Sequence, residues 1–294
     1  MPITEAQRLA RRGHLGSSDM AALLGVDPWR SAADVYLEKT GRLIDDGGGD
    51  GEIDGASALY LGNRLEDSVL DYAEDRLGPL IRNVEKRLDG TPIVVHTDGL
   101  VLKSGEPVEA KTHKIVGGYL SDEHWGGDGS DEVPDRVIVQ AHAHMLAHAA
   151  PVCYVPALIG GRGLTMFTIP FKPRLGDIIA QRAVEFWATN VQGDTPPASS
   201  TPHMQIVKRL RHEPGKVIEV DPAIVQAWLD AKSAASTADA AADEAKAALL
   251  AALGDAEAGE CDALGAVTNY EQTRREYVAK ASTFRVLRFR SKGL

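Results

Sequence analysis

Residues 96–112 read HTDGLVLKSGEPVEAKT, two β-like runs on either side of Ser104-Gly105, a pair that suits a two-residue hairpin turn. With that turn at the centre, Lys111 lies opposite Asp98. Asp98, Glu109 and Lys111 then share one face of the ribbon, because successive side chains of a strand alternate between its faces. The pattern predicts that two carboxylates and one ammonium group converge within a few ångströms.

Asp98 and Glu109 together favour a metal ion, because two neighbouring carboxylates repel one another unless a cation lies between them. Oxygen ligands suit Mg²⁺ or Mn²⁺, which bind through one or two carboxylates and keep waters for a phosphate substrate. Such an ion polarises a scissile phosphate and activates water, while Lys111 would orient the water or stabilise charge on the phosphorus. The alternative is a solvated hairpin with an accidental Glu-x-Lys, and this short spacing does not choose between the two.

Five short motifs follow one another along the chain: Arg11-x-Gly13-x-x-x-Ser17-Ser18-Asp19, Gly62-x-x-x-Glu66, Asp98-Gly99, Glu109-Ala110-Lys111 and Gln140. In this order they resemble the YqaJ-type viral recombinases, a branch of the PD-(D/E)xK nucleases that includes phage lambda exonuclease. Thr97 departs from the pattern, because it stands where the superfamily has the proline of its name. The cysteine cluster of iron–sulfur relatives is absent from the sequence, so no such cofactor is expected.

The resemblance implies a metal site. Its ligands would be Asp98, Glu109, the carbonyl of Ala110 and Glu66, the last directly or through water. Lys111 would position the attacking water, and Gln140 would support that water or Lys111. Two ions of Mg²⁺ or Mn²⁺ are expected there.

The same resemblance implies a DNA substrate. Arg11 and Ser18 would hold the 5′-phosphate of a DNA end, a task that suits a guanidinium fork and a hydroxyl. The implied activity is hydrolysis of linear double-stranded DNA in the 5′→3′ direction, which leaves a 3′ single strand for an annealing protein. Relatives form rings around DNA, so a ring-shaped homo-oligomer is expected. Two alternatives stay open: an endonuclease of the same core, and a non-catalytic adaptor that binds DNA ends.

The fold that the resemblance implies is an α/β, restriction-endonuclease-like core with a mixed central β-sheet flanked by helices, plus a C-terminal helical and strand extension. Within the core, Ser17 or Ser18 would cap a first helix, and Ser31 would cap a second helix over residues 32–39. Apolar periodicity predicts further helices over 58–77, 135–149 and 177–190. Short strands are predicted over 80–84, 92–96, 99–103, 107–112, 152–159 and 164–171.

Pro196-Pro197 begins a linker, so a nuclease domain over residues 1–197 and a C-terminal extension over 198–294 are expected. The extension holds an alanine-rich helix over 222–258 and a basic tail over 274–294, whose seven Arg or Lys residues accompany one acid. The whole chain has a net charge of −10. That charge argues against a protein that coats nucleic acid with its entire surface, but an enzyme can confine basic residues to one groove or channel.

Two cysteines, Cys153 and Cys261, are too few for a disulfide framework or a four-cysteine metal site. The sequence has neither a signal-peptide pattern nor a run of 18 apolar residues, so we expect no membrane partner and a cytoplasmic location in a bacterial or phage-infected cell. Zinc binding by His144 and His148 is an alternative, although the Glu of a metalloprotease motif is missing. A calcium loop from Asp50 is another, with Leu61 where such a loop needs Glu.

Overall fold

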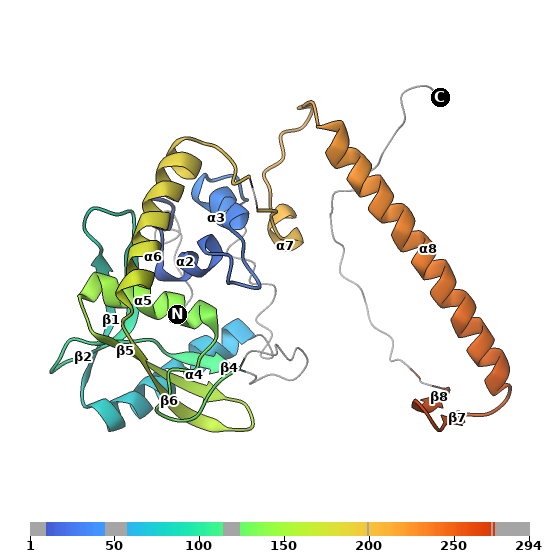
Figure 1. The fold of residues 1–294 in the computed structure, drawn as a ribbon, viewed down its shortest axis with the longest axis horizontal. Helices are drawn as coiled ribbons and strands as arrows, with labels where there is room; N and C mark the ends of the chain where they lie inside the picture. Colours follow the sequence, from blue (N-terminus) through green and yellow to red (C-terminus); the bar gives the residue numbers. More distant parts are fainter. Residues whose placement is uncertain (1–9, 45–57, 114–123, 199, 272, 274–294) are drawn as a thin grey trace. The chain divides into compact units, whose positions relative to one another are not determined.

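A mixed β-sheet lies at the centre of the first of two units into which the chain divides, residues 1–213 and 214–294 (Figure 1). The computed structural model describes residues 10–44, 58–113, 124–198, 200–271 and 273. The predicted acidic loop over 45–55, with the start of the calcium alternative, and the basic tail over 274–294 lie outside the described residues.

The strands of the sheet run in both directions. Strand β1 (Leu80–Arg87) pairs antiparallel with β2 (Val94–Val101), which pairs antiparallel with β3 (Pro107–Val108). Both β3 and β4 (Lys111–His113) pair parallel with β5 (Val152–Ile159), and β6 (Gly163–Pro170) pairs antiparallel with β5. The runs 92–96 and 99–103, predicted as separate strands, belong to the single strand β2, while the predicted run 107–112 is broken into β3 and β4.

Helices cover both faces of the sheet. Along β5, Cys153 and Val155 pack with α5 (Asp135–His148), whereas Tyr154 packs with the cluster of α4 (Ala58–Leu77). Because strand side chains alternate, α4 and α5 lie on opposite faces. This arrangement is the mixed α/β fold with a helix-flanked sheet that the sequence predicts.

A second layer of helices packs outside α5. Helices α2 (Ser17–Leu23), α3 (Ala32–Lys39) and α6 (Pro173–Phe186) bury a shared apolar core with it. The sequence predicts the bounds of α3 and α4 correctly, but α6 begins earlier than the expected 177, at a proline in its first turn, and continues as the π-helix η1 (Trp187–Gln192). Among the described helices, none is both long and apolar enough to cross a bilayer.

The N-terminus of α2 differs from the prediction that Ser17 or Ser18 caps it. Gly16 is the capping residue, and its N–H donates to Asp19 Oδ2 at 2.8 Å. The carboxylate of Asp19 therefore satisfies a backbone group ahead of the first turn, where a negative charge also suits the helix dipole. Ser31 caps α3 as predicted, because its Oγ accepts from Asp34 N at 3.2 Å.

The chain divides after Glu213, beyond the predicted boundary at 197, because the intervening segment packs on α3. Its short helix α7 (Met204–Val207) follows His203, whose N–H donates to Asp34 Oδ1 at 2.8 Å. In the second unit, helix α8 (Pro222–Leu253) has Gly254 as its C-cap and lies within the predicted alanine-rich range 222–258. Strands β7 (Ala258–Cys261) and β8 (Gly265–Thr268) then form a hairpin.

Candidate active site

A pocket of about 310 Å³ lies between α4 and the strands β2, β3 and β4, lined by Gly62, Asn63, Glu66, Val69, Asp98, Glu109, Ala110, Lys111 and Thr112. It brings the predicted ligands Asp98, Glu109, Ala110 and Glu66 together with Lys111. Helix α4 lies close to β4 at Gly62, where a Cβ would make an ordinary contact, 3.4 Å from Thr112 Oγ1.

The break between β3 and β4 joins the two central carboxylates. Glu109 N donates to Tyr154 O of β5 at 2.9 Å, but the next amide, Ala110 N, donates to Asp98 Oδ2 at 2.8 Å. The side chain of Asp98 therefore takes the place of a backbone acceptor in the ladder. This bond holds Asp98 against the Glu109–Lys111 segment.

The predicted register of the hairpin is wrong. Gly99 pairs with Val108 and Leu100 with Pro107, so Lys111 does not lie opposite Asp98. The turn is longer than Ser104-Gly105 and spans residues 102–105, with Gly105 at φ 81°. The shift is even, so it leaves the parity of the residues unchanged.

Strand β2 turns over at Asp98, which the alternation rule cannot foresee. Thr97 contacts His144 of α5 on one face, whereas a Cβ at Gly99 would lie 3.6 Å from Leu70 of α4 on the other. The neighbouring pairs of β1 and β2 place Asn83 opposite Asp98, and Asn83 has φ 56°. Asparagine tolerates this left-handed conformation, which kinks β1 where the turnover occurs.

Asn83→Val is expected to destabilise the chain by about 1–2 kcal/mol, because a β-branched residue resists positive φ, whereas Asn83→Gly should be neutral or stabilising. Urea unfolding of the full chain measures both. Glu85→Val, at an exposed position of the same strand, is the control and should lose less. Equal stability of the Val and Gly variants at residue 83 would contradict the role of the kink.

Both carboxylate oxygens of Glu109 face groups from α5. Oε1 accepts from Lys111 Nζ at 2.6 Å and from Gln140 Nε2 at 2.6 Å. Oε2 lies 2.9 Å from His144 Nε2, which is within ion-pair distance. Lys111 Nζ also donates to Gln140 Oε1 at 2.9 Å. Gln140 thus contacts Lys111, as the resemblance implies, and it also contacts Glu109 directly.

The pocket holds more carboxyl groups than positively charged groups. Burial and the charge of Glu109 raise the pKa of Asp98 well above its ordinary value. Burial also acts to raise the pKa of Glu109, but Lys111 and His144 outweigh it and hold that pKa below the usual value. Burial raises the pKa of Glu66. Three carboxyl groups against one ammonium group make a cation favourable here.

The donor set fits a hard divalent cation. Glu109 Oε2 is buried without a hydrogen-bond partner among the described residues, and the bond from Ala110 N holds the carboxylate of Asp98 in the lining of the same pocket. No group of three or more His, Cys, Asp or Glu residues in the described part of the chain is arranged to hold a metal. Mg²⁺ needs no such group, because it binds through one or two carboxylates and keeps several waters.

The zinc alternative at His144 and His148 is not supported. The nitrogens that face each other, His144 Nδ1 and His148 Nε2, each lie 3.1 Å from Thr97 Oγ1, so a hydroxyl occupies the space between the rings. The Glu109–His144 contact was missed from the sequence. Its signal was the spacing of Gln140 and His144, which places both on one face of a helix.

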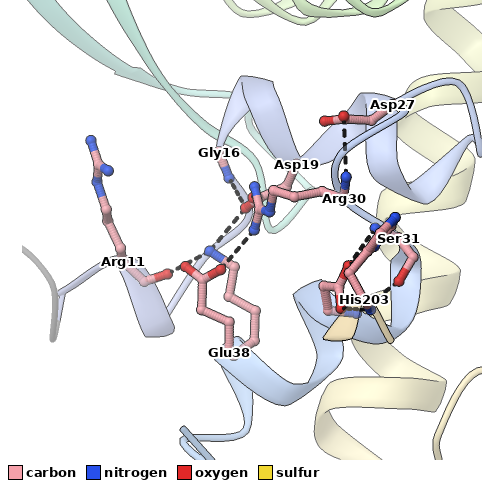
Figure 2. A network of polar contacts seen from close by, with 10 residues as sticks. Arg11, Gly16, Asp19, Asp27, Arg30, Ser31, Glu38 and His203 are labelled. Carbon is pink, nitrogen blue, oxygen red and sulfur yellow. Dashed lines mark hydrogen bonds and ion pairs between the residues drawn. The ribbon is translucent and has the colours of Figure 1, made fainter. Parts of the chain in front are cut away.

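Arg11 and Ser18 do not line this pocket. Both are exposed, and the guanidinium of Arg11 points away from the neighbouring ion pairs (Figure 2). The buried member of their motif is Asp19, whose carboxylate pairs with Arg30 at 2.7 Å and with Lys39 at 2.9 Å. Sequence reasoning assigned Asp19 no role, because the two partners are contributed by α3 and the loop before it.

Comparison with known proteins agrees with the resemblance seen in the sequence. Residues 8–149 match the model of the YqaJ-like viral recombinase domain. The uncharacterized protein YqaJ of Bacillus subtilis (strain 168) is 28% identical over 197 residues, which cover 65% of this chain and 57% of that protein. The chain therefore spans little more than half the length of this relative.

Two solved structures match part of the chain. An alkaline exonuclease from Laribacter hongkongensis is 16% identical with a TM-score of 0.47, covering 65% of this chain and 94% of the exonuclease chain. A phage related exonuclease from Haemophilus somnus 129PT is 13% identical with a TM-score of 0.38, covering 62% of this chain and 97% of the other. The stretch that matches the YqaJ-like viral recombinase model, residues 8–149, covers just under half of the chain and contains every residue of the predicted site.

Proposed function

We propose that this protein is a metal-dependent deoxyribonuclease that hydrolyses the phosphodiesters of linear double-stranded DNA. The observation that carries the proposal is the pocket in which Asp98, Glu109 and Lys111 meet between α4 and the sheet. Two carboxylates and an ammonium group are what phosphodiester hydrolysis needs: ligands for a divalent cation and a donor for developing charge. The recombinase-like domain supports DNA as the substrate.

Five residues of the pocket have a task in the proposed reaction. Asp98, Glu109 and the carbonyl of Ala110 would hold Mg²⁺ or Mn²⁺, with Glu66 as a further carboxylate. The ion supplies Lewis acidity toward the phosphate and lowers the pKa of water. Lys111 Nζ has three N–H bonds, of which two reach Glu109 and Gln140, so one is left for a water or a phosphate oxygen.

The finer parts of the proposal concern direction and assembly. Digestion in the 5′→3′ direction would leave a 3′ single strand for an annealing protein. A ring-shaped homo-oligomer would reconcile the net charge of −10 with DNA binding, if the acids lie outside and basic residues line the channel. A measured mass near the 31.5 kDa of one chain at working concentration would argue against the ring.

The substrate test compares linear, nicked circular and closed circular duplex DNA with Mg²⁺, and with EDTA as the metal-free control. We expect release of nucleotides from the linear duplex alone, and none with EDTA. Cutting of both circles would support the endonuclease alternative. Binding of DNA ends without hydrolysis in either Mg²⁺ or Mn²⁺ would favour the adaptor and exclude the catalytic proposal.

Arg11→Ala is expected to slow digestion of 5′-phosphorylated ends about 10-fold more than digestion of 5′-hydroxyl ends, the value of one charge-assisted pair. The proposal rests on an exposed guanidinium that is turned away from the ion pairs around Asp19 (Figure 2). Initial rates on the two duplexes measure the ratio. Arg174→Ala, at an exposed position of α6, is the control. An equal defect on both ends would refute phosphate recognition by Arg11.

A further inference from the structure

Thr97 places its hydroxyl between two imidazoles of α5. Its Oγ1 lies 3.1 Å from His144 Nδ1 and 3.1 Å from His148 Nε2. Thr97 is 1% exposed and His144 is 0% exposed, so these polar atoms must find partners inside the protein. The other nitrogen of His144, Nε2, lies 2.9 Å from Glu109 Oε2. A continuous line of polar atoms therefore runs from His148 to the carboxylate in the pocket.

The number of protons on each group decides which atoms along this line donate and which accept. A hydroxyl donates one proton, so Thr97 donates to one imidazole and accepts from the other. With His144 neutral, Thr97 must donate to Nδ1, since otherwise Nε2 would present a lone pair to the carboxylate oxygen. With His144 charged, both of its nitrogens carry protons. In either case His144 carries a proton on Nε2, the nitrogen that lies 2.9 Å from Glu109 Oε2.

We propose that Thr97, His144 and His148 form a positioning relay that sets the orientation of Glu109 for metal binding, an inference that rests on the proposed function. His144 contacts Glu109, Thr97 fixes the ring and proton of His144, and His148 anchors Thr97 from the far side. None of the three lines the pocket, so they act through Glu109 and do not touch the metal or DNA.

The relay gives a physical reason for the departure at residue 97. A proline, which the superfamily has there, carries no hydroxyl and could neither donate to His144 nor accept from His148. Outer groups that orient a metal ligand typically change metal affinity by about 10–100-fold when they are removed. Because Thr97 and His144 are buried, water cannot freely replace the missing hydroxyl between them.

The experiment measures Mn²⁺ binding to the full-length chain by titration calorimetry, together with the Mg²⁺ concentration that gives half-maximal DNA hydrolysis. Thr97→Val removes the hydroxyl at nearly constant volume and is expected to raise the Mn²⁺ Kd about 10-fold or more. The half-maximal Mg²⁺ concentration should rise with it. Thr97→Ser keeps the hydroxyl and should restore wild-type affinity. Thr97→Ala carries the same expectation as Thr97→Val if the latter does not fold.

His142 provides the matched control on the same helix. It is also 0% exposed, but its Nδ1 lies 2.8 Å from Ile138 O and its Nε2 accepts from Lys172 N at 3.1 Å, away from Glu109. His142→Gln should lower the Tm and leave the Mn²⁺ Kd unchanged. If it weakens Mn²⁺ binding as much as Thr97→Val does, the effect is a loosening of α5 and the relay is refuted.

The two proposals fail separately in this design. Active wild-type protein with an unchanged Mn²⁺ Kd in the valine and alanine variants overturns the relay and leaves the nuclease intact. Wild-type protein that binds Mn²⁺ but hydrolyses no DNA overturns the nuclease, and the variant Kd values still decide the relay. If the wild-type protein binds no Mn²⁺, or if Asp98→Asn leaves its Mn²⁺ binding unchanged, both proposals are overturned.

Discussion

Lys111→Ala is expected to slow hydrolysis of linear duplex DNA by about 10²–10³-fold at saturating Mg²⁺, the usual cost of removing one donor that stabilises developing charge. Among the residues that line the pocket, no other side chain is cationic. The ammonium group of Lys111 also pairs with Glu109 Oε1 at 2.6 Å. Its removal therefore leaves the repulsion between the carboxylates of Asp98 and Glu109 less compensated. Glu109→Gln should cost at least as much, because it removes both a metal ligand and the partner of Lys111.

The release of acid-soluble nucleotides from linear DNA measures these losses. Lys103→Ala and Glu106→Gln are matched controls. Lys103 lies in the hairpin turn, Glu106 directly follows it, and neither residue lines the pocket. The controls should digest DNA at the wild-type rate. Normal digestion by Lys111→Ala or by Glu109→Gln would remove the basis of the catalytic proposal.

Asp19→Asn is expected to lower the free energy of unfolding by about 3–5 kcal/mol, the range seen when one partner of a buried ion pair is removed. The carboxylate is 5% exposed and pairs with Arg30 at 2.7 Å and with Lys39 at 2.9 Å, while the Lys39 side chain is 3% exposed (Figure 2). An asparagine keeps the shape of Asp19 but leaves Lys39 without its counter-charge and Arg30 with Glu38 as its remaining carboxylate partner. The substitution should therefore lower the free energy of unfolding more than it lowers the rate of DNA hydrolysis.

Urea unfolding of the full chain tests this expectation with a double-mutant cycle. Asp19→Asn combined with Lys39→Met should lose less than the sum of the two single losses, because the second change removes one stranded charge. Asp67→Asn is the control, since its pair with Arg82 is exposed and should contribute about 0–1 kcal/mol. A loss below about 1 kcal/mol for Asp19→Asn would contradict the ion-pair account.

The same carboxylate predicts an acid dependence of stability. Burial acts to raise the pKa of Asp19, but Arg30 and Lys39 outweigh burial and lower the pKa far below the ordinary 3.8. A lowered folded pKa means that the unfolded chain binds the proton first. The stabilisation is therefore complete above about pH 3.8 and is lost as the pH falls below that value. Asp19→Asn should flatten this part of the stability profile.

Much of the fold could be predicted from local sequence signals. Ser31 before an apolar run predicted α3, and the 3.6-residue periodicity predicted α4, because caps and amphipathic spacing act within a few turns of chain. The hairpin over residues 96–112 predicted that Asp98, Glu109 and Lys111 belong together, because paired strands bring residues of matching parity close. These inferences needed no knowledge of distant segments.

Other features could not be predicted because they depend on contacts between distant parts of the chain. The longer turn over 102–105 changed the register, and β2 turns over at Asp98. Neither feature separates the site residues, since Ala110 N donates to Asp98 across the break. The pairing of Asp19 with Arg30 and Lys39 likewise requires α2 and α3 to be packed together. A linear pattern shows which residues have suitable chemistry, but their pairing is decided by packing.

The sequence by itself determined the chemistry of the candidate site: two acids, a lysine and a glutamine at spacings that strands and a helix can bring together. Only the tertiary structure decided how Glu109 is held, because His144 of α5 reaches it and Thr97 of β2 contacts His144 from the far side. Side-chain type and short-range periodicity are written in the chain itself. The burial that makes a hydroxyl or an imidazole matter arises only when the sheet and its helices close around it.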